Sequence, residues 1–145
     1  MDVEGLALLN RRHRRLWVLA LAFHGVDALG SAGLLLAQLP LGPEPLWILV
    51  LVYAAVKLLL WVLVTAEAVR LARAARPWWG LGPGALSLAA ALGAVLPIAL
   101  AALSGFRMRS LACRLSLPGG FFGLPSGSIS ALQHGSRQDG PGQLR

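Results

Sequence analysis

Asp27, Lys57 and His24 are the residues whose chemistry says most about this chain, because each lies within a long run of apolar side chains. Asp27 follows Leu16 by 11 residues, and Lys57 follows Leu46 by 11 residues. A charged side chain at the centre of a bilayer costs roughly 2.5–3.5 kcal/mol on insertion scales, so such residues are rare and usually paired. The equal offsets predict an intramembrane ion pair between Asp27 and Lys57 in an antiparallel hairpin of helices.

Other polar side chains recur along the two runs at helical spacing, which places them on shared faces. The first run carries His24, Ser31 and Gln38 beside Asp27, and the second carries Tyr53, Trp61 and Thr65 beside Lys57. This polar stripe has three interpretations. The two faces bind each other and hold the hairpin together, or His24 and Asp27 form a proton or solute path, or one charge pairs with a membrane helix of another subunit.

The chain lacks the motifs that supply catalysis or hold a metal ion. It has no Gly-rich phosphate loop, no GxSxG, no HExxH and no paired carboxylates. Its single cysteine, Cys113, cannot form an internal disulfide. We therefore expect no enzymatic activity, no cofactor and no metal. Cys113 lies among arginines just after an apolar run, so it is a candidate for S-palmitoylation if it faces the cytoplasm; the alternative is an unmodified thiol.

Composition points to a membrane protein. Hydrophobic residues make up 57% of the 145 and charged residues 13%, with a mean hydropathy of +0.68. Soluble domains average about 45–50% apolar and about 25% charged residues. The net charge of +7 does not indicate a nucleic-acid partner, because the arginines flank apolar runs instead of forming a basic domain. We expect an all-α integral membrane protein with the lipid bilayer as its first partner.

The apolar runs define the predicted elements. Residues 1–15 form a basic N-terminal segment, 16–39 a first transmembrane helix and 46–66 a second, since about 20 residues span the hydrocarbon core. Three prolines within 40–45 predict a tight turn between them. The alternative for the first run is a cleaved signal peptide with Leu16 to Phe23 as its hydrophobic region.

The rest of the chain is less regular. Residues 67–79 are predicted to be a basic cytoplasmic loop in which the second helix continues until Pro77 stops it. A third transmembrane helix is predicted over 85–106. Residues 107–145 are basic and then rich in Gly, Ser and Pro, so we expect a disordered C-terminal tail.

Arginine placement predicts a cytoplasmic N-terminus but conflicts with a third crossing. Four arginines precede the first run, none lie in 40–45, three lie in the second loop and five follow the third run. Cytoplasmic loops are enriched in such charges. Three alternatives reconcile the last five: a re-entrant third run broken at Pro97, a weak influence of late charges, or a missing fourth span in a truncated or spliced form of a four-span protein.

Two short strings add a family resemblance. Leu21 to Asp27 (LAFHGVD) and Tyr53 to Leu60 (YAAVKLLL) resemble pieces of the N-terminal accessory membrane domain of lysosomal peptide transporters of the ABC class. The resemblance covers only these strings, whose separation is shorter than in that domain, and no nucleotide-binding domain follows within the 145 residues. It implies an interaction module within the membrane.

These observations predict a small multi-pass protein of an internal or plasma membrane. The expected function is non-enzymatic interaction or scaffolding, through helix packing with partner membrane proteins or by self-association. The alternative is a small transporter, channel subunit or proton-coupled carrier that uses Asp27, Lys57 and His24.

Overall fold

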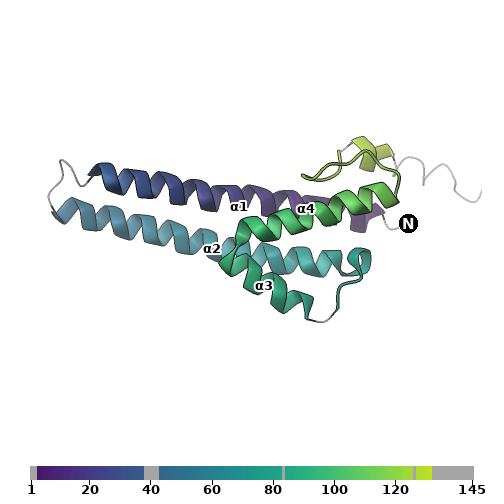
Figure 1. The fold of residues 1–145 in the computed structure, drawn as a ribbon, viewed down its shortest axis with the longest axis horizontal. Helices are drawn as coiled ribbons and strands as arrows, with labels where there is room; N and C mark the ends of the chain where they lie inside the picture. The colour runs from purple at the N-terminus through teal and green to yellow at the C-terminus, as the bar shows by residue number, and fades with distance from the viewer. Residues whose placement is uncertain (1–2, 38–42, 83, 126, 132–145) are drawn as a thin grey trace, which may run out of the picture.

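The computed structural model describes residues 3–37, 43–82, 84–125 and 127–131, and their secondary structure is helical without strands. The helices are α1 (Val3–Ala37), α2 (Pro43–Trp79), α3 (Ala85–Val95) and α4 (Pro97–Arg114). The predicted all-α fold is confirmed. The first two helices form an antiparallel pair along the whole length of the molecule, and the shorter two lie against one half of it (Figure 1).

Helices α1 and α2 are long and apolar enough to cross a membrane. They contain 35 and 37 residues, which corresponds to about 52 and about 55 Å at 1.5 Å per residue. A hydrocarbon core is only about 30 Å thick. Each helix is therefore longer than a span and has room for a polar continuation at one end.

The basic segments predicted at 1–15 and 67–79 are continuations of these helices. α1 begins at Val3, and α2 runs through Pro77 to Trp79. The prediction that Pro77 stops the helix was wrong by two residues. The continuation of α1 is amphipathic, since its buried residues recur every three or four positions: Leu6, Leu9, His13, Leu16 and Ala20. Apolar packing against the end of α2 therefore stabilises the segment that the sequence indicated only as basic.

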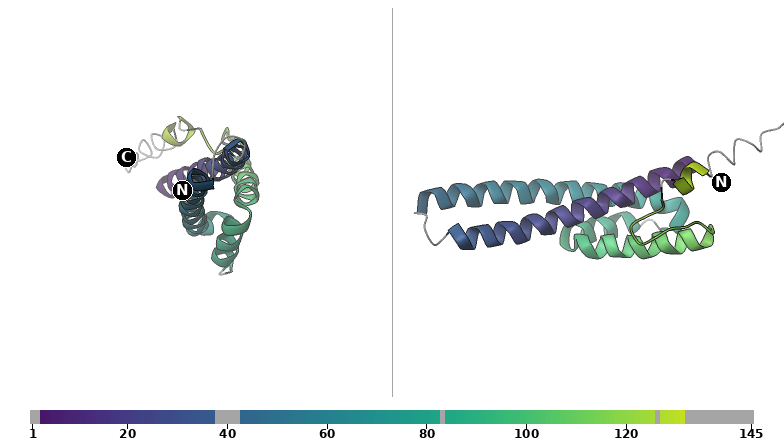
Figure 2. Two further views of the ribbon diagram at one scale, coloured as in Figure 1. Left: turned by 90° about the vertical axis from the view of Figure 1, so that its left-hand side faces the viewer. Right: turned by 90° about the horizontal axis from the view of Figure 1, so that it is seen from above.

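The third apolar run forms two helices, so the single helix predicted over 85–106 is not present, whereas the break at Pro97 that was its alternative is. The chain breaks at Leu96, whose φ of −137° and ψ of 68° are not helical, and Pro97 occupies the first turn of α4. Proline lacks the N–H that a continuing helix needs and clashes with the preceding turn, so it starts a new helix here. α3 runs back along α2 toward its middle, and α4 returns toward the end from which α3 came (Figures 1 and 2).

The packed core lies where α3 and α4 cover the long hairpin. Its fully buried side chains come from α1, α2, α4 and the segment after α4, and they include Leu6, Leu16, Val64, Met108 and Leu124. The other half of the hairpin has no such cover. There, large apolar side chains such as Leu29, Trp47, Leu51 and Leu58 are exposed.

The predicted disordered tail, 107–145, was wrong for its first part. Residues 107–114 belong to α4, and the chain then folds back over α1, where Leu124 is 1% exposed and Ile129 is buried. Composition suggested too little apolar content to fold alone, but the segment does not fold alone. It packs on a surface that α1 and α4 already provide. Residues 132–145 of the predicted tail lie outside the described residues.

Candidate functional site

Asp27 and Lys57 meet between α1 and α2. Lys57 Nζ lies 2.6 Å from Asp27 Oδ1, and the Tyr53 hydroxyl donates a hydrogen bond to the same oxygen at 2.6 Å. Lys57 Nζ also lies 4.0 Å from the centroid of the Phe23 ring, in cation–π geometry. The structure thus brings together the two charges that the sequence placed at equal offsets.

The local sequence of each helix supplies two members of this cluster one turn apart. Phe23 and Asp27 are an i,i+4 pair on α1, and Tyr53 and Lys57 are an i,i+4 pair on α2. Gly30 completes the arrangement, because a Cβ at this position would overlap the Tyr53 ring. The absence of a side chain at Gly30 lets that ring lie against the α1 backbone and reach Asp27.

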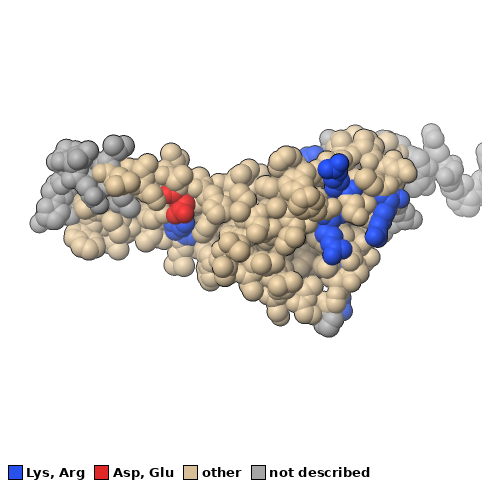
Figure 3. All heavy atoms as spheres, in the orientation of Figure 1, with Lys and Arg blue, Asp and Glu red and all other residues tan. Residues whose placement is uncertain are grey.

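The pair lies at the surface of the hairpin. The Lys57 side chain is 22% exposed and that of Asp27 is 48% exposed. Both hydrogen bonds go to Oδ1, and no described residue donates to Oδ2. In the half where α1 and α2 lie alone, Figure 3 shows adjoining acidic and basic side chains within an otherwise uncharged surface.

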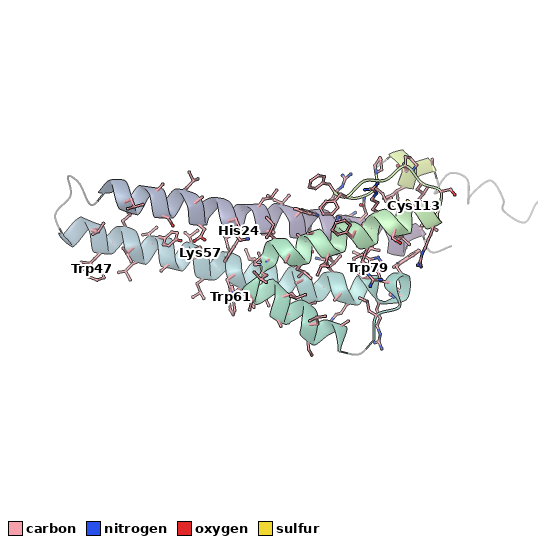
Figure 4. All side chains as sticks on the ribbon, in the orientation of Figure 1. His24, Trp47, Lys57, Trp61, Trp79 and Cys113 are labelled. Atoms are coloured by element: carbon pink, nitrogen blue, oxygen red, sulfur yellow. The ribbon has the colours of Figure 1, made fainter. Side chains whose placement is uncertain are left out.

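Of the remaining members of the predicted polar stripe, Ser31 extends this cluster, because its side chain interacts with that of Tyr53, whereas His24 does not. His24 contacts Phe23 edge to face, and its buried Nε2 has no hydrogen-bond partner. No hydrogen bond joins His24 to Asp27. Ser31 is exposed, and Gln38 lies outside the described residues. Figure 4 shows His24 and Lys57 at neighbouring positions along the two long helices.

Trp61 has a role that the sequence did not reveal. Its indole Nε1 donates a hydrogen bond to the carbonyl of Ala94 at 2.9 Å. The last carbonyls of a helix lack partners within it, and the break at Leu96 places the end of α3 beside α2. Trp61 lies far from the ends of α2 because at this position its indole binds a carbonyl at the point where the third apolar run reverses.

A second polar cluster, also missed from the sequence, joins the start of α1 to the C-terminal segment. Asn10 Nδ2 donates to the Leu124 carbonyl at 3.0 Å, and the Leu124 N–H donates to Asn10 Oδ1 at 2.8 Å. Arg14 Nη2 donates to the same carbonyl at 2.8 Å. One buried amide side chain thus pairs with a backbone as a neighbouring strand would.

His13 occupies the centre of that cluster and is fully buried. Its Nε2 lies 3.0 Å from the Phe121 carbonyl and its Nδ1 lies 3.0 Å from Ser104 Oγ. A carbonyl only accepts, so Nε2 carries a proton and donates it to Phe121. The Ser104 hydroxyl has one hydrogen and lies between Nδ1 and the Ala101 carbonyl, to which it donates at 2.7 Å. His13 precedes the apolar segment that begins at Leu16. Burial lowers the pKa of His13 below its ordinary value of 6.5, although the hydrogen bond to the Phe121 carbonyl acts in the opposite direction and raises it.

The basic side chains gather at the end of the molecule where α3 and α4 lie. Arg12 binds the buried Glu67 with Nη1 at 3.1 and 3.2 Å from its two oxygens, and Arg70 lies 3.5 Å from it. The visible face in Figure 3 shows the basic residues over this half. Cys113 is exposed near the end of α4 in the same region (Figure 4).

These clusters join the helices and the C-terminal segment to one another. Within the described ranges, no three His, Cys, Asp or Glu side chains converge as metal ligands would. No protein-family profile, curated protein or solved structure matches the chain. Evidence for a function therefore comes from the residues and their geometry.

Proposed function

We propose that this chain is a membrane-inserted interaction protein that packs its Asp27 face against a membrane helix of another protein or of a second copy. The two apolar helical segments, 16–37 and 46–66, contain 22 and 21 residues. At 1.5 Å per residue they are about 33 and about 31 Å long, the thickness of a hydrocarbon core. The apolar side chains exposed there contact lipid.

The half-exposed carboxylate of Asp27 carries this proposal. Ionisable residues within membranes face the interior of a helix bundle or a watery cavity, because lipid cannot solvate them. A hairpin of two helices has no such interior, and Asp27 remains 48% exposed after pairing with Lys57. A further helix that covers the Asp27 face supplies the missing cover and a donor for Oδ2.

The exposed side of α1, on the stretch that carries Asp27, suits close approach by another helix. Gly25 and Gly33 have nothing within 4 Å of the position of a Cβ, and Ala28 and Ala32 are exposed. Small residues let helix backbones approach closely in lipid, where packing and hydrogen bonds drive association. The small residues and the carboxylate lie on the same stretch of α1.

The arginines support a cytoplasmic basic end. Because the third run reverses at Leu96, arginines from α1, α2 and α4 gather at one end, while the Asp27 half carries none among the described residues. Enrichment of Lys and Arg marks the cytoplasmic side. A two-span hairpin with a re-entrant α3–α4 pair satisfies this rule without a third crossing.

A proton or solute path has less support. Such a path needs a chain of groups that pass a proton or coordinate a solute. His24 forms no hydrogen bond with the Asp27 cluster, and the Thr65 hydroxyl on α2 is buried without a partner. The polar contacts that are present join α1 to α2.

Single-cysteine crosslinking within membranes tests the proposal. In a Cys113→Ser background, we expect Ala28→Cys and Ser31→Cys, two exposed positions that flank Asp27 on α1, to crosslink to a partner or a second copy. Val62→Cys, an exposed position on α2, is the control and should give little product. Extraction at high pH first establishes that the chain is membrane-inserted. A membrane-inserted chain that stays monomeric and shows no crosslink from the Asp27 face would overturn the interaction proposal.

A further inference from the structure

A cleft opens between α2 and the α3–α4 pair at the basic end of the molecule. It has a volume of about 200 Å³ and is lined mainly by Ala and Leu side chains from the three helices. Ala68, Ala72 and Ala89 form its floor, while Leu88 and Leu103 stand at its sides with much of their surface exposed. We name it the Arg107 cleft, after the one charged residue that lines it.

The packing of α3 explains why the cleft exists. Near its end, α3 touches α2, since a Cβ at Gly93 would lie 2.9 Å from the Cβ of Ala68. Toward its first residue, Ala85, α3 diverges from α2 (Figure 1). Alanines on both facing helices fill little of the space that opens between them, so the cleft widens from the point of contact toward the basic end.

A smaller polar cavity adjoins the cleft. It has a volume of about 80 Å³ and is lined by Trp78, Trp79, Arg107, Ser110, Leu111 and Arg114. Trp79 and Arg107 line both spaces. Two guanidinium groups and a hydroxyl thus converge next to an apolar cleft, and no carboxylate lines either space.

The cationic groups of this cavity are available for an external anion. Arg107 and Arg114 are exposed, and among the described residues neither pairs with a carboxylate or donates a hydrogen bond. The indole Nε1 of Trp79, on the wall between the two spaces, is buried and has no acceptor in the described part of the chain. The site offers donors and positive charge and lacks acceptors of its own.

The depth of the cleft matches a lipid. Trp61 binds Ala94 and lies five residues, about 7 Å, inside the Ala66 end of the apolar segment. Ala85 lies nine residues, about 13 Å, back from Ala94, so the wide end of the cleft is just outside the hydrocarbon, at headgroup level. Trp78 and Trp79 suit that level, where aromatic residues are enriched.

We propose that the Arg107 cleft binds one anionic phospholipid, with an acyl chain between α2 and α3 and the phosphate held by Arg107, Arg114 and Ser110. Basic pockets between membrane helices on the cytoplasmic side are known to hold anionic headgroups. The apolar cleft distinguishes this site from exposed surface arginines, because the cleft binds the acyl chain of the lipid while the arginines bind its phosphate. The inference rests on the membrane insertion proposed above.

Native mass spectrometry of the full chain, purified with phosphatidylglycerol or phosphatidylcholine, tests the site. We expect the parent protein to retain one phosphatidylglycerol molecule. The Arg107→Gln/Arg114→Gln variant removes two charges near the membrane surface, so its affinity for this lipid should fall roughly thirtyfold. Arg11→Gln/Arg15→Gln removes the same charge from two exposed arginines that line neither space. Equal loss in both variants would mean that surface charge alone holds the lipid and would overturn the proposal.

Two further measurements distinguish binding of a lipid from binding of inorganic phosphate alone. Ala89→Leu fills the cleft without changing charge, so it should lower retention of phosphatidylglycerol as strongly as loss of the arginines. If Ala89→Leu retains the lipid, or if inorganic phosphate displaces it, the apolar cleft has no role and the proposal fails. Extraction at high pH identifies a chain that was never in the membrane, which is the separate failure of the proposed function.

Discussion

At the scale of single residues, the Asp27–Lys57 pair joins the two long helices but leaves one oxygen of Asp27 without a hydrogen-bond donor among the described residues. Lys57 is engaged by the Asp27 carboxylate and by the face of the Phe23 ring. Asp27 has two donors on one oxygen and none from the described residues on the other. The lysine is therefore satisfied within the hairpin, whereas the aspartate is available to a second molecule.

A cycle of charge removal measures these two roles. We expect Asp27→Leu and Lys57→Leu each to lower the steady-state abundance of the protein several-fold, because each leaves an unpaired charge in lipid. The double variant should recover most of that loss. It should still fail to assemble with a partner, because assembly uses Asp27. Abundance is measured by quantitative blotting. A double variant as scarce as the singles would contradict an internal pair.

Gly30 offers a test of the same cluster without removing charge. Gly30→Ala places a methyl group in the space of the Tyr53 ring, so the ring must move away from Asp27. We expect lower thermal stability in detergent and a faster loss of helical signal on heating. Gly33→Ala, one turn further along α1 with nothing within 4 Å, is the matched control. If both variants melt like the parent chain, Tyr53 does not depend on Gly30.

At the scale of helices and segments, the sequence predicted the apolar stretches well and their ends poorly. Runs of apolar residues predict α-helix over 16–39 and 46–66. The structure contains helix over 16–37 and 46–66, and residues 38 and 39 lie outside the described residues. The ends were missed because Leu6, Leu9 and Leu71 bury only when distant segments pack on them. The same reason applies to Asn10 and His13, whose partners lie more than 90 residues away.

The C-terminal segment depends on a few buried hydrogen bonds. Asn10→Ala removes both bonds to Leu124 and leaves a buried N–H without its acceptor, at about 1–3 kcal/mol. We expect residues 115–131 to be cut faster by proteases while the long helices remain intact. Asn10→Asp retains one acceptor and should give an intermediate rate. Unchanged cleavage in Asn10→Ala would show that apolar contacts of Leu124 and Ile129 suffice.

The same segment should loosen on mild acidification. The pKa of the buried His13 is lowered, so the released segment binds a proton more readily than the packed one. Packing is therefore fully stable above the ordinary pKa of 6.5 and weakens as pH falls below it. Limited proteolysis across this range, with a protease active throughout, measures the effect. His13→Gln should show no such dependence, and parallel curves for the two proteins would exclude His13 as the cause.

At the scale of the whole molecule, the reversal at Leu96 brings the end of α4 back to the end of the molecule where α1 begins (Figure 1). An intact third span would place Cys113 opposite the N-terminus. With α3 and α4 folded back, the exposed Cys113 and the start of α1 lie at the same end. The sequence left these alternatives open, because apolar length alone does not distinguish one span from two half-length helices joined at a proline.

Thiol labelling decides this topology. An impermeant maleimide added to intact cells should label Cys113 only after the membrane is permeabilised, in parallel with an epitope at the N-terminus. Labelling before permeabilisation, with the N-terminal epitope still protected, would establish a third crossing. A cytoplasmic thiol also makes S-palmitoylation at Cys113 testable, by comparing the parent chain with Cys113→Ser after acyl-biotin exchange.

The contacts between the two ends of the chain have a consequence for its biosynthesis. Asn10 and His13 are translated first, yet their partners at Ser104, Phe121 and Leu124 are among the last described residues to leave the ribosome. The long hairpin can enter the membrane while this end is still open. A chain that stops before Phe121 therefore leaves Asn10 and His13 without these backbone partners and leaves α1 without the cover of Leu124. We expect cellular quality control to recognise that surface, so a chain that includes Phe121 and Leu124 should outlast one that stops before them.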